Sequence, residues 1–512
     1  MTMPTNAAPS IQVDWYADGS YAEAIDEVTP YVLAASSAQP IVVEWGRDTA
    51  RSTSPPMIGA AEFTLANYGR EFSPENPATA RYQFIKTGRP VRIASIHGDR
   101  RLYRSQRLYR SHTPYRGAGR FPLFTGRISA IAQDLAELGS ERTVVSALDL
   151  LAGLRRKTVS VALEWGGLRT DEIVQRILDA AGWPAADRVL RIGDSIVNGY
   201  WVDERSAWDC LVEMLATEGA GAAFFVDALG VFYWFNRNHR AIWPRSTVTQ
   251  ATLHDGTSAT GLLYTRLSYD PRWEDVVDRV TVTTRQRQLA GSESVIWKLG
   301  TSLSVAAGET RVIWARPSEP FQGAVSPVLT TDYTVSGGTV SIALEWSNGA
   351  VAKLNIVGLS GTSTISDLQL RGKSFPVVGE TIIESEATVT SDVEAKTLAI
   401  GAWPELDMNQ AQAIADSYLA RYGDSHPILE VTLQNLDGEA QEAILRFQIS
   451  DRITVINRHL GLHTDFWIER IRHEILGDGR HLVTLSCEAV SDVGSGGALW
   501  DSGLWDSGLW GV

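Results

Sequence analysis

A stretch of alternating polar and apolar residues between positions 59 and 92 limits what this chain can fold into. Glu62 and Thr64 fall on one face of an extended segment, whereas Phe63 and Leu65 fall on the other. This period of two is typical of a half-buried β-strand. Asn, Gly and Pro residues then interrupt the stretch with turn chemistry. The sequence therefore predicts one β-hairpin system of an antiparallel barrel here.

Length and charge narrow the class of protein. A chain of 512 residues, of which 44% are hydrophobic, is long enough for about three or four domains with real cores. The formal net charge of −14 makes bulk attraction to nucleic acid or to an anionic membrane unexpected. An acidic protein is still suited to line a passage for DNA, because it does not hold the DNA back.

Neither the cysteines nor the N-terminus predict export. Cys210 and Cys487 are far apart, so no disulfide framework is expected. Residues 1–10 lack the basic start and apolar core of a secretory signal, and no apolar run is long enough for a membrane span. We expect a soluble protein made in a reducing compartment. The 17 tryptophans favour a role in assembly, because aromatic side chains supply large contact areas at interfaces.

The first alternating stretch also carries residues in a familiar order. Phe63-Thr64-Leu65 is followed by Gly69 to Asn76, then by Gly88 to Ile93, and later by Leu123-Phe124-Thr125-Gly126. This order resembles the N-terminal barrel of phage tail hub or minor tail proteins, which lie at the tip of long-tailed phages and are related to the hubs of contractile tails.

A second block lies near the C-terminus. A helix ending in residues 418–422 precedes strands that begin with Ser450-Asp451-Arg452-Ile453-Thr454-Val455. This arrangement resembles the second barrel of hub proteins in contractile tails and related injection machines. Their motif is usually Gly-Asp-x-Val, and Ser450 replaces the glycine here. The short run from Leu368 to Gly372 also resembles the family.

The patterns and the resemblance together predict the fold class. We expect a mainly β protein with α+β insertions, made of two tail-tube-like antiparallel β-barrels, a small α+β domain and an inserted β-sandwich-like module. The expected parts are a flexible arm (1–10), a first barrel (11–140) with a basic hairpin insert (97–120), an α+β domain (141–262), a second barrel with a helix (263–291 plus 375–490), the inserted module (292–374), and a Gly linker with a Trp-repeat tail (491–512).

Local signals place several elements within these parts. Thr170, Ser206, and Asp407 or Asn409 mark helix starts, because they precede amphipathic runs that end at Gly182, Gly219 and Gly423. Other segments have the composition of strands or hairpins. These are a strand over Val28–Ala34, a hairpin of Ala222–Val226 with Val231–Phe235, and a hairpin of Asp465–Leu476 with His481–Ala489.

The basic insert at residues 97–120 contains a small internal duplication. Arg101-Leu102-Tyr103-Arg104-Ser105 recurs as Arg107-Leu108-Tyr109-Arg110-Ser111. One interpretation is a basic, aromatic finger that touches phosphate or an acidic partner through Arg101, Tyr103, Arg107 and Tyr109. The other is an exposed hairpin loop that tolerates insertion.

The C-terminal tail repeats a five-residue unit that fits neither helix nor strand. The unit Leu499-Trp500-Asp501-Ser502-Gly503 is repeated at residues 504–508 with Trp505, and a third Leu-Trp pair follows with Trp510. Regular tryptophans of this kind predict docking into pockets of a partner. The alternative is a disordered tail of low complexity.

Catalytic and metal-binding patterns are weak. Gly193-Asp194-Ser195-Ile196 is similar to the nucleophile block of GDS-type esterases, with Ser195 as nucleophile and His481 as base. The intervening chain is largely β, which argues against that fold. The residues considered for zinc are His459, His463, His473, His481 and Cys487. Because His-Glu-x-x-His and a P-loop are both absent from the sequence, we expect no enzyme, cofactor or metal site.

The resemblance implies a function in the virion. In related hubs, three copies place six barrels in a ring, so a homotrimer matches a sixfold tail tube. We expect a structural protein that is made in the host cytoplasm and built into the tail tip. Its expected partners are the tail tube or distal tail protein, the tape-measure protein, and a central fibre or receptor-binding protein, with DNA passing without specific binding. The alternative is a peripheral tail protein that binds host glycan or a receptor through residues 292–374.

Overall fold

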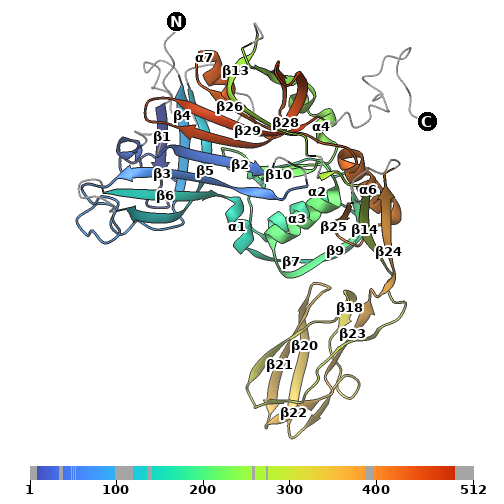
Figure 1. Ribbon diagram of the computed structural model, residues 1–512. Coiled ribbons are helices and arrows are strands. Elements are labelled where there is room, and N and C mark those ends of the chain that lie inside the picture. Colours follow the sequence, from blue (N-terminus) through green and yellow to red (C-terminus); the bar gives the residue numbers. More distant parts are fainter. Residues whose placement is uncertain are drawn as a thin grey trace.

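The protein is mainly β and is built around one large sheet, with a module projecting from it (Figure 1). The structure is a computed structural model. It describes residues 8–33, 39–47, 49, 51, 53–97, 119–134, 141–256, 260–272, 275–387 and 396–490.

The large sheet has 12 strands in the order β1-β4-β5-β6-β3-β2-β28-β27-β12-β13-β26-β29. Its N-terminal strands are β1 (Ala8–Val13), β2 (Ile41–Arg47), β3 (Pro56–Ala66), β4 (Pro90–His97), β5 (Gly119–Asp134) and β6 (Arg142–Asp149). Its later strands are β12 (Thr249–His254), β13 (Leu262–Asp270), β26 (Ile428–Gln434), β27 (Arg452–Asn457), β28 (Leu462–Ile475) and β29 (His481–Ala489).

The six later strands close into a barrel, because β28 pairs with β27 on one side and with β29 on the other. Inside the barrel, β12 runs parallel to both neighbours, and the other pairings are antiparallel. Of the two predicted barrels, a closed ladder of strands is confirmed for this one. The six N-terminal strands form the other half of the same sheet and join the barrel through the β2–β28 pair.

Two local predictions in the N-terminal half are wrong. The stretch from 59 to 92 is not one hairpin system, because β3 pairs with β2 and β6, whereas β4 pairs with β1 and β5. Residues Val28–Ala34 were expected as a strand, but Thr29–Tyr31 form a 3-10 turn with proline near its start. Proline lacks the N–H that a strand ladder needs, and its fixed φ suits the first turn of a helix.

The α+β part between the two halves follows its local signals. It contains α1 (Leu151–Arg156), β7 (Thr158–Arg169), α2 (Thr170–Ala180), β8 (Arg188–Leu190), β9 (Ile196–Ser206), α3 (Ala207–Glu218), β10 (Ala223–Val226), β11 (Phe232–Phe235), α4 (His239–Ile242) and α5 (Pro244–Thr247). The predicted start of α3 is confirmed, because the Ser206 hydroxyl accepts a hydrogen bond from the Asp209 amide. The predicted hairpin is also confirmed as β10 and β11.

A separate three-stranded sheet carries the module. It consists of β14 (Arg279–Arg287), β24 (Val377–Glu386) and β25 (Thr397–Ile400), with α6 (Met408–Tyr422) packed against it. The Asp407 carboxylate accepts from the Gln410 amide and so caps α6, which confirms one of the two predicted starts. A short helix, α7 (Gly438–Ile444), packs on β26.

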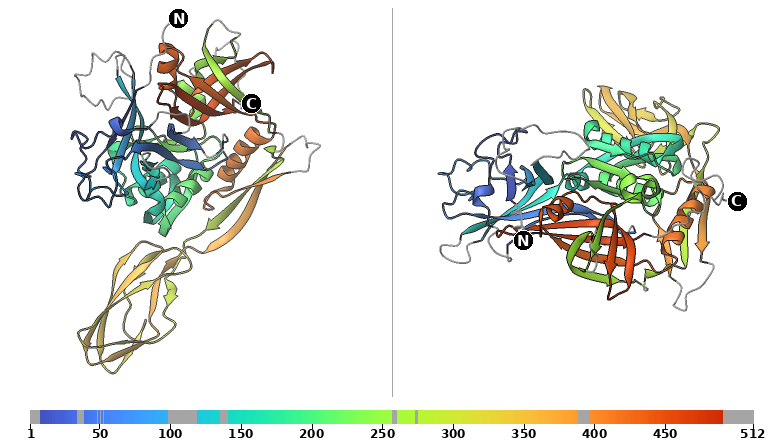
Figure 2. Two further views of the ribbon diagram at one scale, coloured as in Figure 1. Left: turned by 60° about the vertical axis from the view of Figure 1, so that its left-hand side comes forward. Right: turned by 90° about the horizontal axis from the view of Figure 1, so that it is seen from above.

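The module projects away from the main body, as the left view of Figure 2 shows. Its strands are β15 (Ser294–Lys298), β16 (Leu303–Val305), β17 (Thr310–Ala315), β18 (Phe321–Val325), β19 (Thr334–Ser336), β20 (Thr339–Ser347), β21 (Ala352–Ser360), β22 (Ser363–Ser366) and β23 (Gln369–Ser374). They form three three-stranded sheets around an apolar core that includes Phe321, Leu354, Ile356 and Leu370.

Three other cores hold the body together. One lies under the N-terminal strands and includes Ile11, Phe63 and Phe124, and one fills the barrel with residues such as Val455 and Phe466. The third joins the helices of the α+β part to α6. Each fully buried large apolar side chain contributes about 1.5–3 kcal/mol, so these cores account for most of the favourable free energy of folding.

Candidate functional site: the barrel junction and the base of the module

The residues expected to bind partners lie outside the described part of the chain. They are Arg101, Tyr103, Arg107 and Tyr109 in the insert, and Trp500, Trp505 and Trp510 in the tail. Both interpretations of each segment therefore remain predictions.

The two residues of the esterase alternative have structural roles in different parts of the fold. Ser195 is fully buried, and its hydroxyl donates to the Glu218 carbonyl over 3.4 Å. The Glu218 carboxylate accepts from the Asp194 amide at 2.9 Å, so it anchors the turn that was similar to a nucleophile block. His481 lies inside the barrel, where its Nε2 is 2.9 Å from Nδ1 of His473. Ser195 therefore belongs to an anchored turn and His481 to a buried imidazole pair, and the contacts described do not join the two as nucleophile and base.

The same imidazole pair was among the residues considered for zinc. Within the described residues, no three His, Cys, Asp or Glu side chains converge as metal ligands would. Burial lowers the pKa of His481 to about 3 and that of His473 well below its ordinary value, so both rings are neutral near pH 7. Cys487, the nearby cysteine, is buried with a free thiol whose pKa burial raises.

A cluster of buried charges joins the barrel to the N-terminal sheet. Glu469 of β28 is fully buried and accepts from Nε of Arg47, on β2, at 3.0 Å. Its other oxygen lies 2.5 Å from Arg240, which α4 supplies. Burial is costly for any charge, so a carboxylate with two guanidinium partners is the stable arrangement at such a position. Glu469 therefore ties three segments to one point.

A second buried carboxylate extends the cluster to α6. Glu488 of β29 pairs with Arg421 and accepts from the Tyr422 hydroxyl at 2.9 Å. Burial alone would raise the pKa of Glu488, but the charges of Arg421 and Arg240 outweigh it and lower the pKa. The guanidinium groups of Arg240 and Arg421 also lie over the Trp467 ring, 4.8 and 5.3 Å from its centroid. The barrel is thus fixed to α4 and α6 as well.

Ser450 occupies the position where the resemblance expected glycine. Its φ of 70° is in the left-handed region, which glycine adopts without strain. The serine is held there by partners, because its Oγ lies 3.0 Å from Nε2 of His239 and its carbonyl accepts from Ser246 at 2.7 Å. The departure from the motif is therefore accommodated by contacts with α4 and α5.

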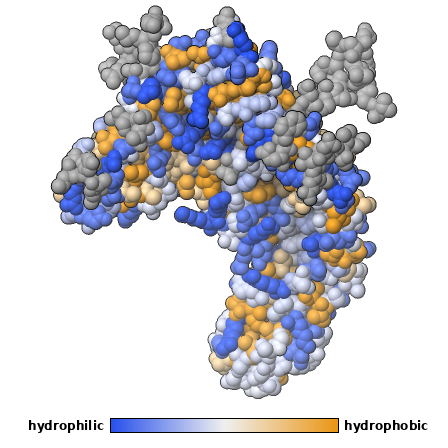
Figure 3. Space-filling model, viewed as in Figure 1, coloured by the Kyte–Doolittle hydropathy of each residue, from blue (hydrophilic) through white to orange (hydrophobic). Residues whose placement is uncertain are grey.

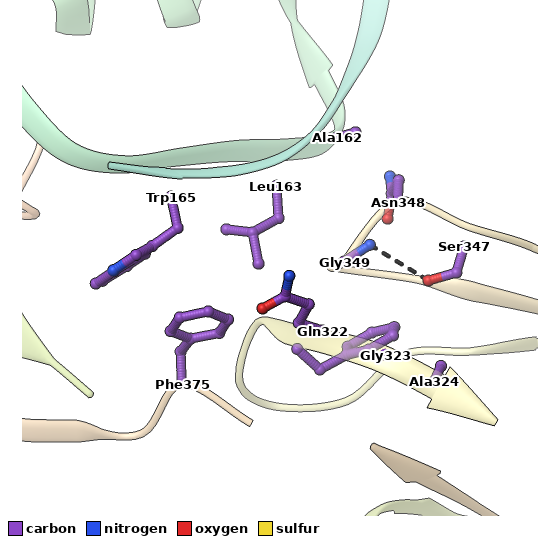
Figure 4. A pocket seen from close by; sticks show the side chains of 11 residues that line it. Ala162, Leu163, Trp165, Gln322, Gly323, Ala324, Ser347, Asn348, Gly349 and Phe375 are labelled. Atoms are coloured by element: carbon purple, nitrogen blue, oxygen red, sulfur yellow. Dashed lines mark hydrogen bonds between the residues drawn. The ribbon is translucent and has the colours of Figure 1, made fainter. Parts of the chain in front are cut away.

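A pocket of about 390 Å³ lies where the module meets strand β7 (Figure 4). Trp165 and Phe375 line one side of it and pack against each other, with ring centroids 4.7 Å apart. Beside it, the Leu163 amide donates to the Asn348 carbonyl at 2.6 Å, and Arg316 is 3.7 Å from Asp203. These contacts place the base of the module against the body, so the pocket belongs to the joint between them.

Sequence reasoning missed the buried charge cluster. A partial signal was present, because Glu469 falls in phase with Ile471 and Ile475 of β28. Its partner is far away in sequence, since Arg47 and Glu469 are 422 positions apart. Periodicity therefore marks one of the two buried carboxylates without naming the guanidinium groups that pair with it.

Comparison with known proteins agrees with this architecture. No protein-family model and no curated protein matches the chain. Among solved structures, a tail protein from Neisseria meningitidis MC58 matches with a TM-score of 0.50 and 11% identity, over 95% of this chain and 98% of that one. The 43 kDa tail protein of prophage MuSo2 from Shewanella oneidensis has a TM-score of 0.49 and 12% identity, over 94% and 98% of the two chains.

The first of these likenesses defines the class of fold. It extends over nearly the whole of both chains. The chain therefore shares the fold of that tail protein.

Proposed function

We propose that this protein is a structural hub of a phage tail tip. Three copies would form a pseudo-sixfold ring that caps the tail tube, surrounds the DNA channel and anchors a central fibre or receptor-binding protein. The proposal unites the hub-like sequence motifs with the tail-protein fold. No catalytic step is part of it.

The observation that carries the proposal is a segment that bridges two strands of the N-terminal half of the sheet. Residues 27–33 cross the open side of the sheet. Gln12 of β1 bridges Glu27, and Val32 bridges Leu65 of β3. The Val28 amide also donates to the Ile11 carbonyl at 3.1 Å. This segment links β1 to β3 beside an apolar core, which supports the proposal that the N-terminal half acts as a second tube-like unit. Three chains would then offer six units.

Rigidity between the two units supports a ring. The β2–β28 ladder runs directly from one unit to the other, and the Arg47–Glu469 pair lies buried on it. Two units fixed in this way keep one spacing and one angle, which closed rotational symmetry requires of repeating parts.

Charge and surface chemistry fit a passage for DNA. The net charge of −14 gives a polyanion no bulk attraction to the protein. None of the helices in the described ranges is long and apolar enough to cross a membrane. We propose the tail tube or distal tail protein and the tape-measure protein as the further neighbours of the ring.

The test is the mass of the assembly. Native mass spectrometry of the purified chain, and of the tail tip that contains it, is expected to give three copies per ring. A stable monomer or dimer within the tail would contradict the proposal.

A peripheral role in glycan or receptor binding remains a second candidate function. The observation in its favour is a pair of exposed tryptophans on the module, Trp314 and Trp346. A position away from the tail axis would favour this candidate, whereas a position around the axis would favour the hub.

A further inference from the structure

One face of the module carries an aromatic surface that its own core does not use. In the sheet β17-β21-β20, Trp314 and Trp346 are both paired in register with Lys353 of the central strand. The three side chains therefore form one row across three strands. Figure 3 shows the module standing clear of the body.

The two indole rings form an open corner. Their centroids are 6.0 Å apart, and the ring planes meet at 75°. Trp314 is 52% exposed and Trp346 is 44% exposed. Such exposure is unusual for tryptophan, whose large apolar surface is normally buried against other side chains. The core beneath consists of Leu354, Ile356 and their neighbours, so the indoles are not needed to fill it.

Polar groups surround the corner. Nζ of Lys353 lies 5.9 Å from the Trp314 centroid and 2.9 Å from a carboxylate oxygen of Glu345. In the next row, Asn355 lies between Val312 and Ala343. Its Oδ1 is shielded from solvent and has no hydrogen-bond partner among the described residues. Such an oxygen gains free energy when a donor reaches it after a small rotation of the amide.

Charge separates this module from the rest of the protein. Residues 292–374 contain six acidic and six basic side chains and are formally neutral, whereas the whole chain carries −14. The remainder of the chain therefore holds the entire net charge. A neutral surface neither attracts nor repels an uncharged ligand, and it approaches an anionic cell surface with less repulsion than the body does.

We propose that the Trp314–Lys353–Trp346 face binds an uncharged polysaccharide chain. The flat C–H faces of two adjacent sugar rings would stack on the two indoles. The sugar hydroxyls would hydrogen-bond to the ammonium of Lys353, the carboxylate of Glu345 and the amide of Asn355. A purely apolar protein segment would remove the Lys353–Glu345 pair and the Asn355 amide from water without offering them hydrogen bonds, which disfavours it. The site extends the second candidate function and does not depend on the copy number of the ring.

Isothermal titration of the full-length protein with cellohexaose, chitohexaose and maltohexaose tests the site. At least one hexasaccharide is expected to bind. Trp314→Ala and Trp346→Ala are each expected to weaken its affinity about tenfold, which corresponds to about 1.4 kcal/mol. Trp314→Phe retains a ring and should lose less. Tyr68→Ala, which removes an exposed aromatic side chain outside the module, is the matched control and should leave the affinity unchanged.

Several outcomes would overturn the proposal. One is the absence of binding by all three hexasaccharides, and another is binding that survives the double substitution of both tryptophans. A third is a change in the mass of the assembly without any effect on sugar binding, which would make this face a protein interface. The thermal midpoint of each variant shows that it is folded. Because ring mass and sugar binding are separate readouts, failure of one proposal is distinguishable from failure of the other.

Discussion

The N-terminal sheet and the C-terminal barrel have six strands each, yet they are closed in different ways. The barrel is closed by a full ladder between β28 and β29. The N-terminal unit is bridged at single points by residues 27–33. The barrel also meets its neighbours through buried charges, whereas the N-terminal core is apolar. The comparison shows that two halves of one sheet can be completed differently, one by a ladder of paired strands and the other by isolated bridges.

Loss of Glu469 tests the charged junction and has the largest expected effect. Glu469→Ala leaves Arg47 and Arg240 buried without their shared carboxylate, so the free energy of unfolding should fall by about 3–5 kcal/mol. Denaturant unfolding followed by tryptophan fluorescence measures it.

The same pair of strands provides the matched control for this variant. Glu44 of β2 pairs with Arg470 of β28 at 2.7 Å, but both side chains are partly exposed. Glu44→Ala should therefore cost about 1 kcal/mol or less. Equal losses in Glu44→Ala and Glu469→Ala would contradict a special role for the buried junction.

Acid should destabilise the barrel more than the N-terminal unit. His426, His473 and His481 belong to the barrel or its edge, and burial lowers the pKa of each, to about 4 for His426 and about 3 for His481. The unfolded chain binds these protons near pH 6.5, so stability is full above that pH. It falls by about 1.4 kcal/mol per pH unit for each histidine as the pH drops toward the folded-state pKa.

The pKa of Asp149, at the end of β6, is shifted in the opposite direction, so its effect on stability changes with pH in the opposite sense. Burial raises its pKa to about 7, so the folded state binds the proton more tightly than the unfolded state does. Its contribution to stability is fully present below about pH 4 and is lost as the pH rises through about 7. Hydrogen exchange at pH 5 and pH 7.5, corrected for intrinsic rates, should show protection lost at pH 5 in β26–β29 and kept in β3 and β6. The reverse pattern would be inconsistent with these pKa shifts.

The closing segment of the N-terminal unit gives a smaller effect. Val28 is fully buried, so Val28→Ala should lower the free energy of unfolding by about 2 kcal/mol. Exchange should accelerate in β1 and β3, because residues 27–33 bridge both strands. Val455→Ala, at an equally buried position in the barrel, should have a similar cost without accelerating β1. Uniform acceleration in both variants would mean that the two units open together.

The smallest effect concerns backbone amides in the unaltered protein. The Val28 amide bonds at an isolated bridge, whereas Ile471 to Ile475 of β28 lie within a continuous run of the ladder with β29. Local opening requires fewer broken contacts at the bridge, so Val28 should exchange faster than the amides of β28. Similar rates at both places would remove the difference between the two kinds of closure.

The sequence predicted elements whose signals are local. The caps at Ser206 and Asp407 and the turn at 477–479 confirm α3, α6 and the β28–β29 hairpin, because each depends on neighbouring residues. Strand partners were not predictable in the same way. The period of two shows which face of β3 is buried, but it does not show that β6, about 80 residues later, supplies the partner.

The candidate sites were predictable to different extents. Tryptophans in the strands of the inserted module are visible in the sequence, and the module was already the alternative site of glycan binding. The row of Trp314, Lys353 and Trp346 needed the register of three strands. The buried cluster around Glu469 needed the whole fold, because its guanidinium partners come from β2 and α4.

A map of the tail tip that contains this protein tests the central claim most directly. The account predicts a ring of three copies around the tail axis, with the closed barrel and the N-terminal unit of each chain alternating as six similar densities around the channel. A ring of any other copy number, or a chain located only at the periphery of the tip, would contradict it.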